Sequence, residues 1–214
     1  MNCKMLREVS VIKSLRMNIY YFGWKSIFHP IIICSKNVKI RELKGSIDID
    51  GGEKLKFGFN SIGCFDEKNE SSVWQNRGKI VLKGSAFLGS GTKLSNSGTI
   101  IFGNKFSISG NTTIICGNQI EFGESNLISW DCLFMDTDLH DIIGPDGKKK
   151  NMNSPIIIGD RVWFGCRCTI TKGTVIGNDN IVAANSGLHG KYYVNKCCIG
   201  DDGTILKENV TWKK

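Results

Sequence analysis

The sequence predicts an all-β protein whose short strands wind into a parallel β-helix of six-residue repeats. From residue 158 the chain divides into hexads, each of which opens on a large apolar residue and carries a small or modest residue at its fifth position. An amphipathic helix would space its apolar residues three and four apart. The 25 glycines and 3 prolines among 214 residues indicate many tight turns and exclude collagen and proline-rich disorder. The hexads open on Ile158, Phe164, Ile170, Ile176 and Val182.

The same period extends far upstream. It runs in three series that slip by two residues relative to one another, and each slip indicates a corner loop. Because side chains alternate across a strand, the first and fifth residues of a hexad are expected inside and the sixth outside. The series are Leu82, Leu88, Leu94 and Ile100, then Phe102, Ile108, Ile114 and Ile120, then Phe122, Ile128 and Phe134.

The chain changes character outside these repeats. Apolar residues at mixed three- and four-residue spacing between residues 5 and 28 predict an amphipathic helix that caps the open end of the β-helix. The hexads also fail around Pro145-Asp146-Gly147, which predicts one protruding loop. The length suits one domain. Its expected parts are a helical segment at 1–30, irregular early coils at 31–79, the regular β-helix at 80–199 with its loop at 141–155, and a C-terminal tail at 200–214.

Charge and cysteine content indicate which classes of partner and which cellular compartment to expect. A net charge of +8 and a pI near 9.0 favour anionic partners, such as a nucleotide cofactor, nucleic acid or an acidic membrane. No apolar run is long enough to span a membrane and the first residues are charged, so we expect a cytoplasmic protein. The cysteines form no CxxC pair, so we expect neither a metal site nor a disulfide framework. We interpret them as reduced, buried apolar residues.

Residues 158–186, IGDRVWFGCRCTITKGTVIGNDNIVAANS, resemble the hexapeptide-repeat acyltransferases. The resemblance covers about residues 80–212 and is strongest at 154–186. The members most similar to the sequence are bacterial sugar O-acetyltransferases, both of the galactoside and maltose acetyltransferase type and of capsule or lipopolysaccharide biosynthesis. The resemblance implies a left-handed β-helix, acetyl-CoA as acyl donor, and a homotrimer with active sites between subunits. The β-helix at 80–199 is then the catalytic domain.

The segment LFMDTDLHDI, residues 133–142, is similar to the family segment in which a histidine closes one coil beside a protruding loop. The resemblance implies that His140 is the catalytic base. A neutral imidazole suits this task because its pKa lies near working pH. Asp138 and Asp136 stand close enough in sequence to orient it, and the alternative for both is turn capping. The resemblance also implies that Asn111, in GNTTI, binds the acceptor sugar one coil earlier.

Coenzyme contacts are implied farther along the chain. Trp163 is the sixth residue of its hexad and should face outward, where the matching family tryptophan lines the coenzyme A channel; a plain subunit contact is the alternative. The ending departs from the family at Gly200 to Thr204, which replace a segment with a proline and a basic residue. The basic side chain that the resemblance implies for one coenzyme phosphate contact is therefore not present in this segment. Further positions that match the border of the coenzyme are Cys166, Ala184, Ser186 and Lys191.

The function expected on this basis is acetyl-CoA-dependent O-acetylation of a saccharide in cell-surface polysaccharide biosynthesis. The same fold hosts amino-sugar N-acyltransferases and serine acetyltransferases, and a structural trimer is the non-enzymatic alternative. A zinc-dependent carbonic anhydrase on this fold binds zinc between subunits with three histidines, two of them closely spaced. This chain has three histidines, and no two of them are close in sequence. Nucleic acid is not expected as a partner, because basic and aromatic residues do not interleave along a stripe.

The N-terminal segment suggests where the acceptor is held. It combines basic residues with aromatic ones, which is typical of helices that lie at a membrane surface. We therefore expect a large or lipid-linked acceptor at the inner face of the membrane, with capping of the β-helix as the alternative role of the helix. The basic residues concerned are Lys13, Arg16 and Lys25.

Overall fold

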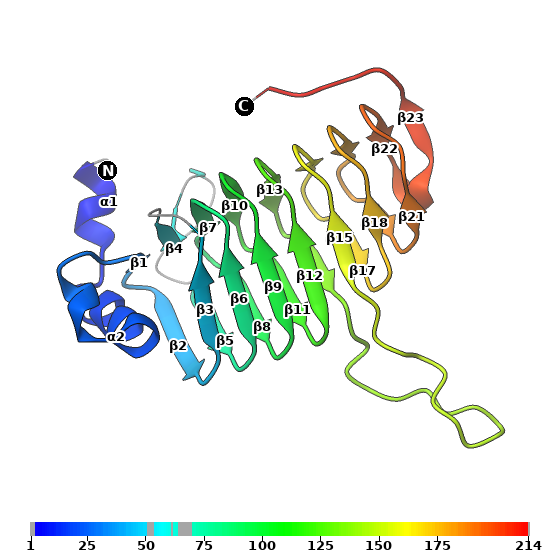
Figure 1. Cartoon of the computed structure of the whole chain (residues 1–214). Coiled ribbons are helices and arrows are strands. Elements are labelled where there is room, and N and C mark those ends of the chain that lie inside the picture. The colour runs from blue at the N-terminus through cyan, green and yellow to red at the C-terminus, as the bar shows by residue number, and fades with distance from the viewer. Residues whose placement is uncertain (1–2, 51–53, 61, 64–69, 214) are drawn as a thin grey trace.

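The computed structural model describes residues 3–50, 54–60, 62–63 and 70–213 and forms a left-handed parallel β-helix (Figure 1). The chain visits three sheets in turn, so each coil is roughly triangular in section. The expected fold class is confirmed. The first sheet contains β1 (Ile32–Cys34), β4 (Leu55–Phe59), β7 (Ala86–Gly89), β10 (Phe106–Gly110), β13 (Leu127–Trp130), β16 (Trp163–Phe164), β19 (Ile181–Val182), β22 (Cys198–Ile199) and β23 (Ile205–Lys207).

Two further sheets complete the prism. The second contains β2 (Val38–Leu43), β5 (Ser72–Asn76), β8 (Lys93–Asn96), β11 (Thr113–Cys116), β14 (Leu133–Met135), β17 (Thr169–Thr171) and β20 (Gly187–Leu188). The third contains β3 (Ser46–Ile49), β6 (Lys79–Leu82), β9 (Thr99–Phe102), β12 (Gln119–Phe122), β15 (Ile156–Ile158), β18 (Val175–Ile176) and β21 (Lys191–Tyr192). We name the corners by the sheets they join: the first–second, second–third and third–first edges.

The slips in the hexad pattern reflect a change in coil length. On the third sheet, Ile80, Ile100 and Ile120 stack in register, so these coils contain twenty residues. Later coils contain eighteen, as the pairing of Phe164 with Val182 shows. In the longer coils, Ile100 and Phe102 both point inward from β9, and the extra residues are accommodated at the second–third edge.

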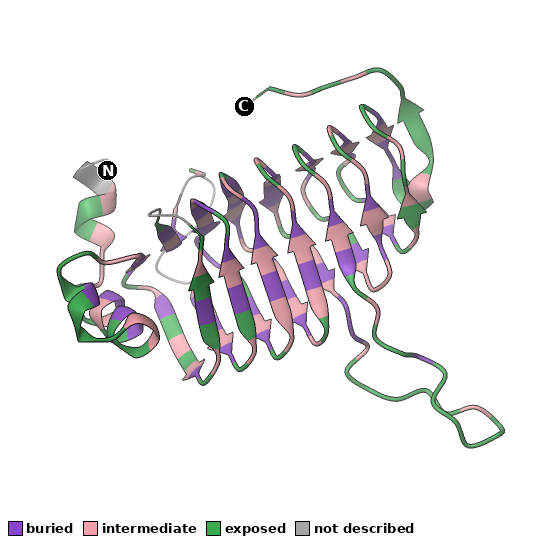
Figure 2. Ribbon diagram, in the orientation of Figure 1, coloured by how far each residue is buried: buried purple, intermediate pink, exposed green. Residues whose placement is uncertain are grey.

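The core is a single apolar column inside the prism (Figure 2). Every predicted hexad opener is buried, as are the fifth residues from Val162 to Ser186. Phenylalanines stack through the middle coils, with ring centroids 5.9 Å apart for Phe102 and Phe122 and 5.1 Å apart for Phe122 and Phe134. Burying each such side chain contributes about 1.5–3 kcal/mol. The repeat therefore stabilises the fold by stacking identical inward positions.

The buried cysteines belong to this column, as the sequence predicts. Cys34, Cys116, Cys132, Cys168 and Cys197 are buried and unoxidised. Burial raises the pKa of the Cys34 and Cys116 thiols to about 12. Such thiols stay protonated and act as small apolar side chains rather than nucleophiles.

The N-terminal segment caps the first coil but is not one continuous helix. It consists of α1 (Cys3–Glu8), α2 (Val11–Phe22) and a 3₁₀ turn, η1 (Trp24–Ile27). Ser10 separates α1 from α2 because its extended backbone and its hydroxyl, which accepts from the amide of Lys13, form an N-cap. Gly23 ends α2 with a φ of 77°. Among the described helices, none has the length and apolar character needed to cross a bilayer.

Buried hydrogen bonds fix α2 on the β-helix. The side-chain oxygen of Asn18 accepts from the amides of Ile31 and Ile32, at 2.7 and 3.0 Å. Its side-chain nitrogen donates to the carbonyl of Ile32 at 2.7 Å. These bonds pair the backbone polar groups of Ile31 and Ile32 where the chain enters β1, and they hold α2 across the open end of the prism.

The other end of the β-helix is closed by the chain itself. After a 3₁₀ turn, η2 (Asp201–Gly203), β23 pairs antiparallel with β22. The tail then runs back along the third–first edge, where the indole of Trp212 donates to the carbonyl of Arg161 at 2.8 Å. The altered segment from Gly200 to Thr204 thus forms a turn, in which the Asp201 carboxylate accepts from the amide of Gly187 at 2.7 Å.

Candidate active site

His140 lies at the second–third edge, where the repeat is interrupted. In the preceding coil, β11 passes directly to β12 through a tight turn, whereas β14 ends at Met135 and β15 begins only at Ile156. The residues between them leave the prism as a long loop (Figure 1). His140 is exposed at the base of this loop. The interruption predicted at 141–155 therefore places the histidine beside a protrusion.

Asp136 holds the coil and does not face the loop. Its carboxylate is fully buried and accepts from the amides of Gly117 and Asn118 in the preceding coil, at 2.6 and 2.9 Å. The thiol of Cys116 also donates to it, at 3.5 Å. Of the two roles considered for this residue, the structure places it in turn capping.

Asp138 is the centre of a polar cluster at the base of the loop. Its Oδ2 accepts from the Nδ2 atom of Asn151 at 2.6 Å and from the ammonium group of Lys172 in the following coil. Lys172 first, and then Asn151, hold the pKa of the Asp138 carboxyl below its usual range. Asp138 is consequently an anion that ties the loop to the β-helix.

Asn151 closes the base of the loop around His140. Its Nδ2 atom also donates to the backbone carbonyl of His140 at 2.8 Å, and its Oδ1 atom accepts from the amide of Ile142 at 2.7 Å. Asn151 is itself buried. The imidazole of His140 has no hydrogen-bond or ion-pair partner within the described part of the chain. The cluster therefore fixes the histidine backbone and leaves both ring nitrogens available.

The loop carries a surface that a monomer leaves uncovered. Its tip is a short hairpin closed by an Ile143–Lys149 bridge, and its lysines are partly neutralised by ion pairs from Lys149 to Asp141 and from Lys150 to Asp146. Large apolar side chains nevertheless stay exposed along it, which marks an interaction surface. These are Leu139, Ile142, Ile143 and Met152.

The structure places Asn111 away from His140. Asn111 occupies the first–second edge, where its Nδ2 atom donates to Asp131 at 2.5 Å and its Oδ1 atom accepts from Lys93 at 2.9 Å. The pairing of β11 with β14 places residue 118, and not residue 111, one coil below Asp138. Asn118 is exposed there. The polar group next to the histidine edge in the preceding coil is thus Asn118.

Trp163 faces out of the first sheet, as its position in the hexad predicts. Its indole nitrogen donates to the hydroxyl of Ser129 at 3.2 Å, and its ring lies 6.3 Å from that of Trp212 in the tail. Cys166 and Ala184 lie toward the first–second edge, half-buried and exposed respectively. Ser186 is only 2% exposed, so its side chain belongs to the core and only its backbone could meet a ligand.

Two groups of the predicted residues therefore lie on opposite sides of the prism. His140, Asp138 and Lys191 lie at or just past the second–third edge, and Lys191 opens β21 two coils after the histidine. Trp163 projects from the first sheet. In a triangular section, the second–third edge lies opposite the first sheet. One chain consequently does not bring His140 and Trp163 together, and a site containing both requires two copies.

Lys172, Asn151 and Asn118 were not singled out from the sequence. A signal existed for Asn118, because the twenty-residue register places it below Asp138. Lys172 pairs with a residue 34 positions away, and Asn151 belongs to a non-repeating loop. Within the described ranges, no group of three or more His, Cys, Asp or Glu side chains could hold a metal ion.

Known proteins share the repeat of this chain. Residues 155–190 match the family described as bacterial transferase hexapeptide (six repeats). The "Putative lipopolysaccharide biosynthesis O-acetyl transferase WbbJ" of Escherichia coli K12 is 38% identical over 66 residues, which cover 29% of this chain and 34% of that protein. An "Uncharacterized 24.8 kDa protein in cps region" of Klebsiella pneumoniae is 26% identical over 89% of this chain and 85% of its own.

A solved structure shares the fold. The polySia specific acetyltransferase NeuO superposes with a TM-score of 0.52 at 16% identity, covering 86% of this chain and 78% of its own. Over residues 155–190 the chain is therefore similar to the hexapeptide-repeat transferases, and its overall fold is shared with an acetyltransferase.

Proposed function

We propose that this protein is an acetyl-CoA-dependent O-acetyltransferase that modifies a saccharide hydroxyl in cell-surface polysaccharide biosynthesis. The observation that carries the proposal is His140, whose exposed ring has no partner among the described residues, while buried Asn151 fixes its backbone where the repeat is interrupted between β14 and β15. The names of the Escherichia coli and Klebsiella relatives, which refer to lipopolysaccharide biosynthesis and to a cps region, support the substrate class.

The mechanism needs one base and no acyl-enzyme intermediate. A neutral His140 accepts the proton of the acceptor hydroxyl as its oxygen attacks the thioester carbonyl of acetyl-CoA. The carbonyl oxygen becomes an oxyanion, which a backbone amide stabilises. When the tetrahedral intermediate collapses, the C–S bond breaks and the imidazolium returns its proton to the departing thiolate. The products are the O-acetyl saccharide and coenzyme A.

The Asp138 cluster positions the base. Asp138, bound by Lys172 and Asn151, anchors the segment on which His140 sits. Lys172 also balances the charge of this carboxylate.

A homotrimer completes the site. The two groups of residues face opposite ways on one chain, and the loop exposes Ile142, Ile143 and Met152. In a closed ring of three copies, the base of the loop on one copy meets the β16 end of the first sheet of the next, and the earlier strands of that sheet stay open. The ring then brings His140 of one copy to Trp163 of its neighbour, with acetyl-CoA bound between them. Backbone groups of Cys166, Ala184 and Ser186 border the coenzyme in this arrangement.

The N-terminal cap gives the trimer a surface for the membrane face. Its helices expose large apolar side chains, up to 81% for Ile12 and 72% for Phe28, next to basic ones. This combination suits an interface with anionic lipid, where a lipid-linked saccharide is presented. The exposed residues concerned are Val11, Ile12, Trp24 and Phe28, with Arg16 and Lys25 beside them.

The test is turnover of acetyl-CoA with a panel of free and lipid-linked saccharides, including amino sugars. We expect transfer to hydroxyl groups, detected as alkali-labile acetyl ester. His140→Ala should reduce kcat by at least about 10², the low end of a general-base contribution, while the melting shift induced by acetyl-CoA is retained. Asp141→Ala, at the adjacent exposed position, is the control. Wild-type turnover in the His140 variant, or alkali-stable amide as the only product, would contradict the proposal.

A further inference from the structure

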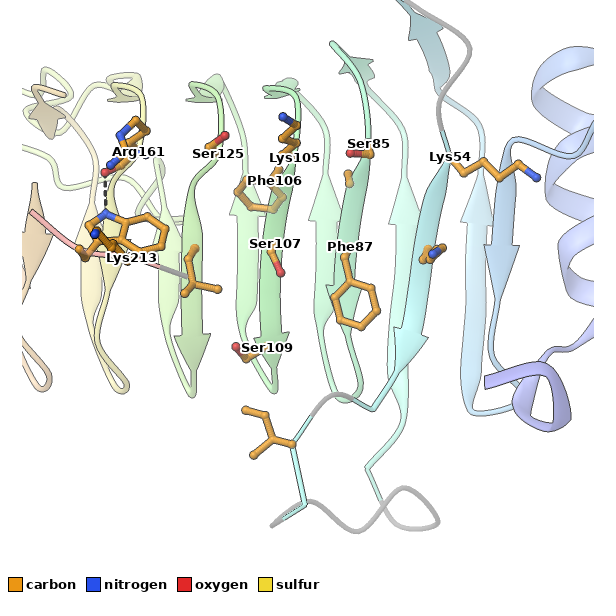
Figure 3. A pocket seen from close by; sticks show the side chains of 15 residues that line it. Lys54, Ser85, Phe87, Lys105, Phe106, Ser107, Ser109, Ser125, Arg161 and Lys213 are labelled. Atoms are coloured by element: carbon orange, nitrogen blue, oxygen red, sulfur yellow. Dashed lines mark hydrogen bonds between the residues drawn. The ribbon is translucent and has the colours of Figure 1, made fainter. Parts of the chain in front are cut away.

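A long groove runs along the outer face of the first sheet, mainly on coils that precede those used by the catalytic proposal. Its volume is about 1120 Å³, and its lining extends from residues at β4 to Arg161 and the tail at Trp212. Figure 3 shows side chains from successive strands pointing into it. The tail forms one wall, because Trp212 donates to Arg161. Neighbouring strands lie about 4.8 Å apart, so the groove spans roughly 19 Å from β4 to β16.

The groove is strongly cationic. Of the described residues that line it, five are basic and none is acidic. Arg161 is paired with Asp179 at 2.6 Å, but the four lysines make no ion pair within the described chain. Among the described residues, therefore, no carboxylate pairs with these four lysines, and all four line one elongated cavity. The lysines are Lys54, Lys56, Lys105 and Lys213.

The floor of the groove alternates apolar and hydroxyl-bearing side chains. In the register of the parallel strands, Phe87 lies between Lys56 on β4 and Ser107 on β10. Ser107 is followed in the same row by Leu127 on β13. Ring faces and hydroxyls in this order match a saccharide, whose rings have apolar faces and whose edges carry hydroxyls. The next residue in this register is Trp163. The floor thus leads directly to the residue placed beside the coenzyme.

We propose that this groove binds an acidic polysaccharide chain and delivers it to the acetylation site, so that the acceptor is a polymer bearing regularly spaced carboxylates. This inference rests on the proposed function and names its substrate class. Several lysines along one groove favour a chain with repeated negative charges over a neutral one. The groove lies mainly on coils that precede the loop, whereas the residues assigned to acetyl-CoA lie on β16 and beyond.

The experiment measures binding of an oligogalacturonide, which carries one carboxylate per sugar, to the full-length protein without acetyl-CoA. A neutral malto-oligosaccharide of the same length is the matched ligand. We expect the acidic chain to bind and the neutral chain to bind at least about tenfold more weakly, with a difference that decreases as salt is raised. Lys56→Gln with Lys105→Gln should weaken binding of the acidic chain about tenfold.

The control variant is Lys39→Gln with Lys207→Gln, which removes the same charge from two exposed lysines outside the groove. We expect it to bind the acidic chain like the wild type, and far-ultraviolet circular dichroism confirms that both variants fold. Three results would overturn the groove proposal. They are an equal loss of affinity for the acidic chain in the two double variants, equal binding of the acidic and neutral chains, and competitive displacement of the acidic chain by coenzyme A. None of these outcomes bears on acetyl transfer to small acceptors by the wild-type protein, which tests the proposed function separately.

Discussion

Replacement of Asp136 by alanine distinguishes a carboxylate that holds the coil from one that serves the chemistry. The side chain is fully buried and accepts two backbone amide bonds, at 2.6 and 2.9 Å from Gly117 and Asn118. Hydrogen bonds to a charged group contribute about 1.5–3 kcal/mol each, and their loss leaves two amides without partners. Removing a buried charge offsets part of this cost. We expect a net loss of about 3 kcal/mol in the free energy of unfolding.

For a chain of this size, such a loss lowers the melting temperature by about 6–12 °C. Thermal unfolding followed by far-ultraviolet circular dichroism at neutral pH measures it. Asp136→Asn, which keeps the shape but turns one acceptor into a donor facing an amide, should recover only part of the loss. Asp48→Ala, at an exposed residue paired with Lys79, is the control and should change stability by no more than about 0.5 kcal/mol.

The result that refutes this reasoning is a specific one. If Asp136→Ala melts within the range of the control and yet loses acetyl transfer at low temperature, Asp136 acts on His140 and not on the coil. If the variant is destabilised and turnover of the folded protein is near that of the wild type, turn capping is confirmed.

Three further predictions address the loop, the cap and the assembly. Lys172→Met should raise the pKa of Asp138, because Lys172 is the main cause of its low value. In the wild type, the contacts of the ionised Asp138 hold the loop above the usual aspartate range and are lost as the pH falls through the depressed folded pKa. In the variant, release of loop 141–155 should therefore occur at a higher pH. Carboxyl NMR titration and pepsin cleavage of the loop measure this, and an unmoved transition contradicts it. The protein should sediment with anionic vesicles at low salt, and Ile12→Glu with Phe28→Glu should abolish sedimentation while Leu206→Glu at the opposite end does not; equal behaviour of the two variants contradicts membrane contact. Light scattering at micromolar concentration should give the mass of three chains, and a stable monomer would rule out the shared active site.

The sequence by itself determined the fold class and which side of each strand faces the core. Successive side chains of a strand point to opposite sides, so a six-residue period fixes inward and outward positions without any long-range information. Phe164 and Val182 were predictable as core, and Trp163 as an outward residue, for this reason. The interruption after Phe134 likewise revealed the loop, because fifteen residues without the period cannot continue the coil.

The tertiary structure alone decided which residues of different coils meet. A coil of twenty residues and one of eighteen share the same local period, and the place where the extra residues are accommodated sets the register between coils. That register brings Lys172 to Asp138 and places Asn118, instead of Asn111, below it. It also turns Asp136 toward the preceding coil. These contacts join segments far apart in the chain, and the physical reason they escape sequence analysis is that edge loops, unlike strands, impose no fixed period on the residues they contain.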